Sequence, residues 1–290
     1  MKFGLLYLLK DEGHPLNKAC KLLEASTSGF YDWLKGRSSK RKESDNKLKL
    51  KIRDVFEKSD QNYGSPRIHK SLRKNGEAVS ENKVAKLMRE EGISAQKKKA
   101  FRPKTTINNP NTNKSPRVFD GDTSHVTGPN QVWVSDLTYL STGDGFSYLV
   151  TVMDLYNREI KGWDVSDSMD AINTKEALLM ALRASPGTLN GLVFHSDQGV
   201  QYCSSEVRDK LNFLNIDQSM SRKGNCYDNS FAESFFGSLK REMRVTHFED
   251  LNEAKREVFR YLNWYNQDRL HSSLGHMSPV EYLYENCLAA

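Results

Sequence analysis

The sequence predicts an α/β fold, in which helices flank a mixed five-stranded sheet and an all-helical region comes first. Three strand-like runs begin near residue 131 and follow one another closely: QVWVSDLTYL, FSYLVTVMDLY and REIKGWDVS. Helical and strand-like segments then alternate, which is the order typical of a sheet with parallel strands. The 290 residues are 37% hydrophobic and 28% charged, which is ordinary for a globular protein and excludes wholesale disorder.

Residues 1–60 are expected to form an N-terminal helix-turn-helix and a connecting helix. Pro15 suits the first position of a helix, and the cluster from Ser26 to Gly29 interrupts the helical pattern before FYDWLKG resumes it. The second helix of such a pair enters the major groove in DNA-binding proteins, but a plain helical hairpin is an equally good interpretation. The segment 38–59 begins as a charged linker and becomes an amphipathic helix through Leu48, Ile52, Val55 and Phe56.

Residues 61–95 are expected to form a second helix-turn-helix-like region. Pro66 opens its first helix, Ser80 fits the N-cap of ENKVAKLMREE, and Gly92 fits the C′ position that ends it. The side of this helix opposite its apolar stripe is basic, and it is either solvated or in contact with DNA phosphates; we favour phosphates. The cations on it are Lys83, Lys86 and Arg89.

Positive charge is concentrated in the first part of the chain. Residues 1–104 have a net charge of +13 and the remainder −7, so the first part is expected to hold a polyanion. A solvated basic surface without a partner is the alternative. Residues 96–128 are poor in large apolar residues and predict a basic linker. The linker cations expected to follow a nucleic-acid backbone are Lys97, Lys98, Lys99 and Arg102.

Residues 129–245 are expected to form the core. Short turns join the three strand-like runs, so these predict an antiparallel meander. A helix near 173–184, the strand GLVFHSD, a helix at 204–214, the strand IDQSMS and a long helix from about Asp228 follow. This is the order of the ribonuclease-H-like fold, whose parallel portion follows from right-handed crossovers. Residues 246–290 are expected to form a C-terminal helical region.

Three carboxylates lie on separate elements of this core. Asp136 is within the first strand, Asp197 is at the carboxyl end of a later strand, and Glu233 is one turn inside the long helix, 35 intervening residues further on. A carboxylate within a central strand is costly unless a metal or partners neutralise it, and open α/β sheets bind ligands at strand carboxyl ends. Mg²⁺ binds through a few carboxylates and takes phosphate oxygens as further ligands. Two such ions can hold the attacking and leaving oxygens of a displacement, so the set predicts polynucleotidyl transfer.

Basic residues accompany the third carboxylate. Lys240 follows Glu233 by two helical turns and suits a phosphate, and Arg241 and Arg244 extend the basic surface. Further cations expected to contact DNA beside this helix are Arg222 and Lys223.

Four polar residues carry weaker interpretations. His195 either orients a water or a phosphate or is a satisfied histidine near the site. Asn229 either caps the long helix or acts beside the metals. A single aspartate at a strand end is more often a structural hydrogen-bonding group than a ligand, so Asp154 and Asp164 are interpreted as structural.

Four strings resemble the integrase-type core of bacterial insertion-sequence transposases: WVSDLTYL, HSDQGVQY, SMSRKGNCYDNSFAESFFGSLKRE and WYNQDRLHSSLGHMSPVEY. They are similar to the second-frame (OrfB) product of the insertion-sequence-three family, and YGSPRIHKSLRKNG with VSENKVAKLMREEGI resembles the helix-turn-helix region of the same products. The resemblance implies that Asp136, Asp197 and Glu233 are the catalytic triad of the DDE type and that Lys240 is its associated basic residue. It implies Mg²⁺ as the metal, with two ions bound and Mn²⁺ as a substitute. The tail residues that it assigns to the family domain are Trp264, Asn266, Arg269, His271 and Pro279.

The expected function is that of a DNA transposase, which cuts DNA at insertion-sequence ends and transfers the 3′-OH to a target. We expect Asp136 to bridge two metal ions, and Asp197 and Glu233 to hold one each. The alternatives are a DNA-binding regulator whose core has lost catalysis and a ribonuclease-H-like nuclease that does not join strands.

The expected partners follow from this function. They are double-stranded DNA of the terminal inverted repeats and the target, further copies of the chain on that DNA, and the upstream-frame (OrfA) product, separate or fused. The sequence has no run of about 18 apolar residues, so no membrane association is expected. A location in the bacterial cytoplasm, at the nucleoid, is expected for such a protein.

Overall fold

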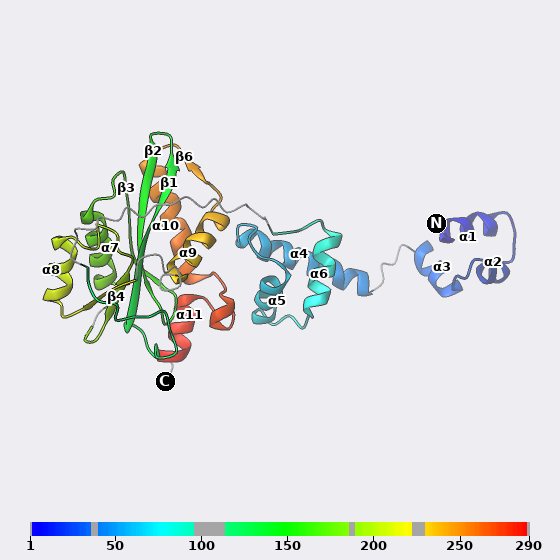
Figure 1. The fold of residues 1–290 in the computed structure, drawn as a ribbon. Coiled ribbons are helices and arrows are strands. Elements are labelled where there is room, and N and C mark those ends of the chain that lie inside the picture. The colour runs from blue at the N-terminus through cyan, green and yellow to red at the C-terminus, as the bar shows by residue number, and fades with distance from the viewer. Residues whose placement is uncertain (1, 36–39, 96–113, 186–188, 222–229, 289–290) are drawn as a thin grey trace. The chain divides into compact units, whose positions relative to one another are not determined.

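The computed structural model describes residues 2–35, 40–95, 114–185, 189–221 and 230–288 (Figure 1). The chain divides into two compact units, Met1–Ala95 and Gln96–Ala290. Within these described ranges the first unit contains helices and the second contains all the strands.

Three short helices open the first unit: α1 (Lys2–Asp11), α2 (Leu16–Leu22) and α3 (Thr27–Leu34). The Ser26 side chain caps α3 by accepting a hydrogen bond of 3.0 Å from the Gly29 amide, so the Ser-Thr-Ser-Gly cluster separates the two predicted helices. The sequence pattern did not predict α1, which supplies part of their shared core. The buried side chains of that core are Leu6, Ala19, Cys20 and Phe30.

A second group of helices consists of α4 (Lys40–Lys58), α5 (Ser65–Lys74) and α6 (Glu81–Glu90). α4 begins at Lys40, so most of the charged stretch that was expected to start as a linker is helical. Ser80 caps α6 by accepting a hydrogen bond of 3.3 Å from the Lys83 amide, and Gly92 follows with φ +67°, as predicted. The apolar residues buried in this group include Ile52, Phe56, Ile68, Leu72, Val84 and Leu87.

The second unit is built on one mixed sheet. Its main strands are β1 (Val132–Thr142), β2 (Gly145–Asp154), β3 (Ile160–Ser166), β4 (Val193–Ser196) and β5 (Asp217–Met220), in the order β3-β2-β1-β4-β5. β2 is antiparallel to both β1 and β3, whereas β4 pairs with β1 in parallel and β5 pairs with β4 in parallel. A strand of two residues that the sequence did not predict, β6 (His247–Phe248), pairs with β1. The topology confirms the predicted ribonuclease-H-like fold.

Helices cover both faces of the sheet (Figure 1). α7 (Ala171–Arg183) and α8 (Ser205–Phe213) pack on one face, and α9 (Ser230–Glu242) and α10 (Leu251–Gln267) on the other. Alternation along β1 separates the two cores, because Trp133 packs with α7 and α8 while Val132 and Val134 pack with α9 and α10. After α10 the chain forms a 3₁₀ turn (Ser272–Leu274), α11 (Pro279–Leu283) and a π-helical end (Tyr284–Leu288).

The described part of the expected linker, residues 114–128, packs along β5. The Ser219 hydroxyl accepts hydrogen bonds of 2.9 Å from the amides of both Val118 and Phe119, and the Ser115 hydroxyl donates one of 2.8 Å to Gln218. Phe119 is 2% exposed and belongs to the core on the α9 and α10 face. These residues therefore pack as part of the second unit, while 96–113 lie outside the described residues.

Truncation of Phe119 to Ala is expected to destabilise the second unit by about 3–5 kcal/mol, because it removes a buried ring and leaves a cavity. Chemical denaturation followed by tryptophan fluorescence would measure the loss. The adjacent Val118 is 53% exposed, so Val118→Ala is the matched control and should cost little. Equal stability of the two variants would show that this segment does not belong to the core.

Candidate active site

Asp136 lies in β1, on the face that α9 and α10 cover. Val132 and Val134 face that side, and a strand returns to the same face every second residue. The side chain of Asp136 is half-buried, where the apolar stripe of β1 gives way to polar residues. Asp136 therefore follows two buried valines on the same face of β1.

Asp197 lies beside Asp136 at the same height of the sheet. The last recorded pair between the parallel strands β1 and β4 is Val134 with His195, and each aspartate lies two residues further along its strand. Asp197 follows the end of β4, and its Oδ1 accepts a hydrogen bond of 2.8 Å from the Gly199 amide, which holds the carboxylate at the strand terminus. Two carboxylates therefore meet where open α/β sheets bind ligands.

Tyr202 packs on the α7 and α8 face of the sheet, close enough to both aspartates to feel their charge, and it was not among the predicted site residues. Its side chain is fully buried, and its hydroxyl lies 3.0 Å from the Ser135 hydroxyl. Burial raises the pKa of the Tyr202 phenol well above its usual value, and the charges of Asp136 and Asp197 raise it further. Both carboxylates therefore lie within electrostatic reach of one neutral hydroxyl. The string HSDQGVQY, which ends on Tyr202, was the available signal.

Helix α9 contributes Lys240 to this region. The Lys240 ammonium lies 4.4 Å from the centroid of the Tyr139 ring on β1. Burial lowers the pKa of Lys240, while the nearby Asp136 carboxylate opposes that change. The structure thus places Lys240 within electrostatic reach of Asp136, while Asp197 lies at the end of the neighbouring strand.

Glu233 is exposed on α9, two turns before Lys240. The neighbouring side chains Phe235 and Leu239 are buried, so the predicted separation of Glu233 from the packing stripe of the helix is observed. Across the described ranges, which omit 222–229, no group of three or more His, Cys, Asp or Glu side chains is placed to hold a metal ion. Glu233 is therefore not gathered with the two aspartates in this structure.

The carboxylates of Asp136 and Asp197 are of the kind that binds a hard divalent cation. Asp136 and Asp197 supply two carboxylates at one sheet edge, and Mg²⁺ is held in proteins by one or two carboxylates together with waters and phosphate oxygens. These two residues fit the implied metal as a partial ligand set, to which Glu233 can add a third carboxylate.

His195 is fully buried in the core beside the site. Its Nδ1 lies 2.9 Å from the Ser219 hydroxyl, and its ring meets Phe119 edge to face with centroids 5.2 Å apart. These contacts, made by Nδ1 and the ring, hold residues 114–128 against the sheet. Several predicted residues lie outside the described residues: Asn229, Arg222, Lys223, Lys97, Lys98, Lys99 and Arg102.

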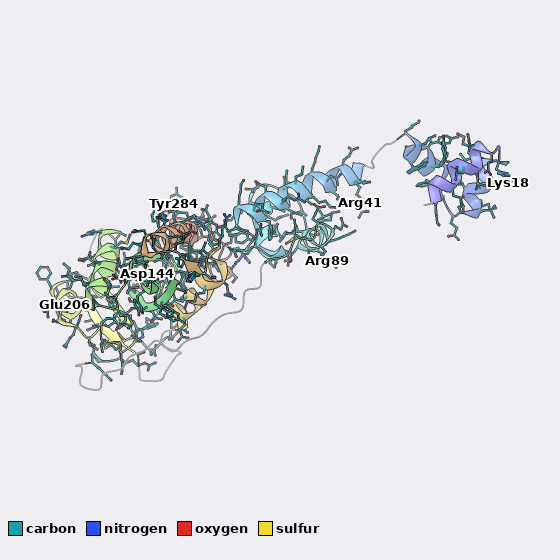
Figure 2. All side chains as sticks on the ribbon, turned by 90° about the horizontal axis from the view of Figure 1, so that it is seen from above. Lys18, Arg41, Arg89, Asp144, Glu206 and Tyr284 are labelled. Carbon is teal, nitrogen blue, oxygen red and sulfur yellow. The ribbon has the colours of Figure 1, made fainter. Side chains whose placement is uncertain are left out.

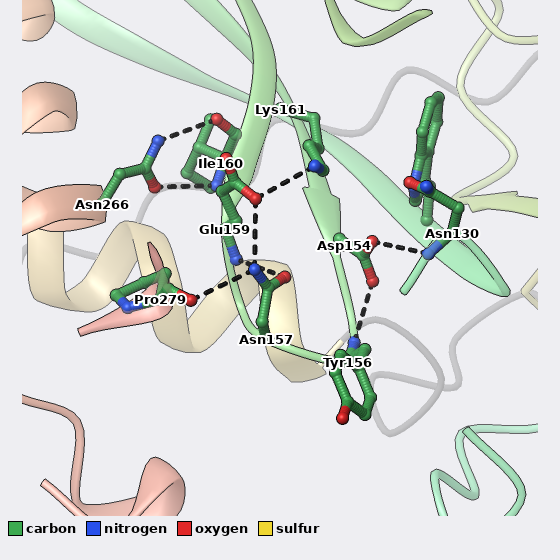
Figure 3. A network of polar contacts seen from close by, with 10 residues as sticks. Asn130, Asp154, Tyr156, Asn157, Glu159, Ile160, Lys161, Asn266 and Pro279 are labelled. Carbon is green, nitrogen blue, oxygen red and sulfur yellow. Dashed lines mark hydrogen bonds and ion pairs between the residues drawn. The ribbon is translucent and has the colours of Figure 1, made fainter. Parts of the chain in front are cut away.

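Asp154, the last residue of β2, has a structural role (Figure 3). Its carboxylate accepts hydrogen bonds of 2.8 Å from the Asn130 amide and 3.0 Å from the Tyr156 amide, so it fixes the turn between β2 and β3. Burial raises the pKa of this carboxyl group, and the two amides oppose the change. Burial also raises the pKa of Asp164 on β3.

The cations of α6 differ in how they are placed. Lys83 forms an ion pair of 2.6 Å with Asp45, and Lys86 lies 3.8 Å from Glu90, so their charges are partly compensated within the unit. Arg89, labelled in Figure 2, is exposed, and its Nε donates a hydrogen bond of 3.4 Å to the Ala85 carbonyl oxygen of the same helix. Arg241, on α9, and Arg244, two residues after the end of that helix, are likewise exposed.

Comparisons with known proteins identify the family. Residues 43–101 match a family model described as an HTH-like domain, and residues 126–226 and 214–279 match two models described as an integrase core domain. The insertion element IS600 uncharacterized 31 kDa protein of Shigella sonnei is 39% identical over 91% of this chain and 96% of its own. Transposase InsF for insertion sequence IS3A of Escherichia coli (strain K12) is 36% identical over 92% of this chain and 93% of its own.

The chain belongs to the IS3 family of insertion-sequence transposases. The match to residues 214–279 places α9, α10 and most of the tail of this transposase within the integrase core. Among solved structures, the HTLV-2 integrase catalytic core domain in complex with magnesium aligns with 54% of the chain and 97% of that domain, at 16% identity and a TM-score of 0.42. The helices in the described ranges include none that is long and apolar enough to cross a membrane.

Proposed function

We propose that this transposase cuts DNA at the ends of its insertion sequence in a metal-dependent reaction and joins the freed 3′-OH ends to target DNA. The observation that carries the proposal is the register of the parallel strands β1 and β4, which pairs Val134 with His195 and so directs Asp136 and Asp197, each two residues further along the chain, to the same end of the sheet. Paired carboxylates at that edge are suited to phosphoryl transfer, in which positioning and charge stabilisation dominate.

Each residue has a separate task in this proposal. Asp136 and Asp197 would hold Mg²⁺ from the sheet, and Glu233 would add a third carboxylate from α9. When bound there, Mg²⁺, or Mn²⁺ as the expected substitute, would supply charge stabilisation for the attacking and leaving oxygens. Lys240, which lies within electrostatic reach of Asp136, neutralises a phosphate of the DNA that enters along α9. The hydroxyl pair of Tyr202 and Ser135 supports β1 from the α7 and α8 face of the sheet.

The helical first unit holds the DNA in this proposal. It carries most of the excess positive charge of the chain, and DNA binding by phosphate contacts releases counterions. If about six phosphates are contacted, affinity should fall about a thousandfold between 50 and 200 mM salt. Two element ends must meet, so we expect several copies of the transposase on the DNA, with the upstream-frame product as a partner or fused segment.

Incubation with a duplex that carries an element end, a target plasmid and Mg²⁺ tests the function. We expect cleavage that exposes a 3′-OH and covalent joining of that end to the plasmid, both suppressed by chelation of the metal. Cleavage without a joined product would identify a hydrolytic nuclease instead. Tight, salt-sensitive binding without any cleavage would identify a DNA-binding regulator.

A further inference from the structure

Helix α9 is tied at its C-terminal end to the chain that follows α10. The Arg269 guanidinium binds Glu242, the last residue of α9, through two parallel contacts: Nε to Oε2 at 2.6 Å and Nη2 to Oε1 at 2.7 Å. The Tyr261 hydroxyl donates a further hydrogen bond of 3.1 Å to the same carboxylate. Arg269 is 5% exposed, so this charge pair is almost wholly removed from water.

Aromatic contacts extend this tie to the middle of α9. The Tyr265 ring meets the His271 ring edge to face at 4.8 Å, and Arg269 lies over Tyr265 at 5.5 Å. Tyr265 also meets the Phe235 ring of α9 edge to face, with centroids 5.0 Å apart. Phe235 is two residues after Glu233, so the contact braces the helix next to the exposed carboxylate.

A third contact reaches the first turn of α9. The Asn266 side chain binds both backbone groups of Ile160 at 3.0 Å, which fixes the loop between β2 and β3 (Figure 3). Arg158, in that loop, places its guanidinium carbon 4.1 Å from the centroid of the Phe231 ring. Phe231 precedes Glu233 by two residues, so α10 and the tail hold α9 on both sides of Glu233.

Stability alone does not account for the Arg269–Glu242 pair. A buried ion pair is weak evidence for stability, because apolar residues of similar volume often serve as well. A two-point Arg–carboxylate contact does, however, fix direction as well as distance. A slip of α9 by one residue would turn Glu233 by about 100° and shift it by about 1.5 Å, which is enough to remove a carboxylate from a metal.

We propose that Arg269 is a positioning residue of the transposase: its two-point contact with Glu242 sets the rotation and height of α9, and thereby where Glu233 and Lys240 stand relative to Asp136. The proposal rests on the function proposed above. The motif WYNQDRLH thereby acquires a role, because its residues Asn266, Arg269 and His271 all take part in the contacts that hold α9.

The test uses the full chain and two readouts, thermal unfolding and titration with Mn²⁺ followed by electron paramagnetic resonance of the free ion. The double variant Glu242→Leu/Arg269→Met keeps a filled, uncharged interior but loses the two-point contact. We expect its melting temperature to stay close to that of the unchanged chain, while its Mn²⁺ affinity and its cleavage rate fall by about 10–100-fold, the usual effect of residues that orient metal ligands.

Two further variants sharpen the result. Arg269→Lys keeps the charge but makes a single-point contact, and it should restore part of the Mn²⁺ affinity. Glu257→Gln/Arg260→Gln removes an ion pair of 2.6 Å on α10 and should leave Mn²⁺ affinity unchanged.

Unaltered Mn²⁺ affinity in the folded double variant would overturn the proposal. The proposal would also be overturned if, in every variant, the loss of Mn²⁺ affinity were proportional to the fall in melting temperature. If the double variant does not fold, Arg269→Lys alone decides the question. A Mn²⁺ affinity of Arg269→Lys equal to that of the unchanged chain would refute the positioning role of Arg269. The titration contains no DNA, so an unchanged chain that binds Mn²⁺ but joins no ends would overturn the proposed function only.

Discussion

Replacement of Asp136 by Asn is expected to abolish both DNA cleavage and strand joining while DNA binding persists. The amide has almost the same volume as the carboxylate but removes the negative charge that would hold a divalent cation. Residues that merely orient metal ligands cost 10–100-fold when they are lost, so a ligand should cost at least about 100-fold. Product analysis on a labelled element end, with gel-shift titration of the same duplex, would measure the two effects separately.

Asp164→Asn is the matched control for this substitution. Asp164 is a half-buried carboxylate of the same sheet, but it lies on β3, two strands away from Asp136 on β1. Its replacement should leave cleavage and joining intact. Normal strand joining by Asp136→Asn would refute the catalytic assignment, and loss of DNA binding would show that the residue supports the fold instead.

Local patterns predicted most of the fold because the longer strands of the core are apolar runs and its helices repeat their apolar residues. β1, β2 and β3 are apolar runs separated by short turns, which leaves an antiparallel meander as the simplest arrangement. The capping residue Ser80 and the terminal Gly92 acted through their immediate neighbours, so their roles could be predicted from sequence.

Contacts between distant segments could not be predicted in this way. Phe119 stands in a stretch of polar composition, and only its pairing with Ser219, 100 residues further on, shows that it belongs to the core. Arg269 and Glu242 are 27 residues apart, and no local sequence pattern around either residue predicts that they form a pair. The two residues of β6 are too few to show any period.

In the candidate site, too, some residues could be predicted from local pattern and others could not. Asp136 and Asp197 follow apolar runs in strands, so their meeting at one sheet edge was predictable from strand order, and the β1–β4 register agrees with it. The hydroxyl contact of Tyr202 could not be inferred from the string HSDQGVQY, because a buried tyrosine looks like any core aromatic until its hydroxyl is placed. The catalytic role of the three carboxylates remains a prediction.

Gly162→Ala is expected to disrupt the second unit. A Cβ atom at Gly162 on β3 would lie 2.0 Å from the Ala177 carbonyl oxygen and 2.7 Å from the Ala181 nitrogen, both in the backbone of α7. Since neither atom can turn aside, α7 must move off the sheet, which loosens the core around Ala177, Leu178 and Ala181. Overpacking of this kind typically costs about 1–3 kcal/mol and occasionally more, and the backbone clash favours the upper end.

Thermal unfolding would measure this effect, and a loss of about 3 kcal/mol corresponds to roughly 6–12 °C for a unit of this size. Gly237→Ala is the matched control, because no atom lies within 4 Å of a Cβ at that position of α9 and Ala favours a helix by about 1 kcal/mol. A melting temperature of Gly162→Ala equal to that of the unchanged chain would contradict the close packing of β3 and α7. Because β3 is two strands away from Asp136, molecules of Gly162→Ala that do fold should cleave DNA at the normal rate, so this substitution separates the stability of the core from the chemistry at its edge.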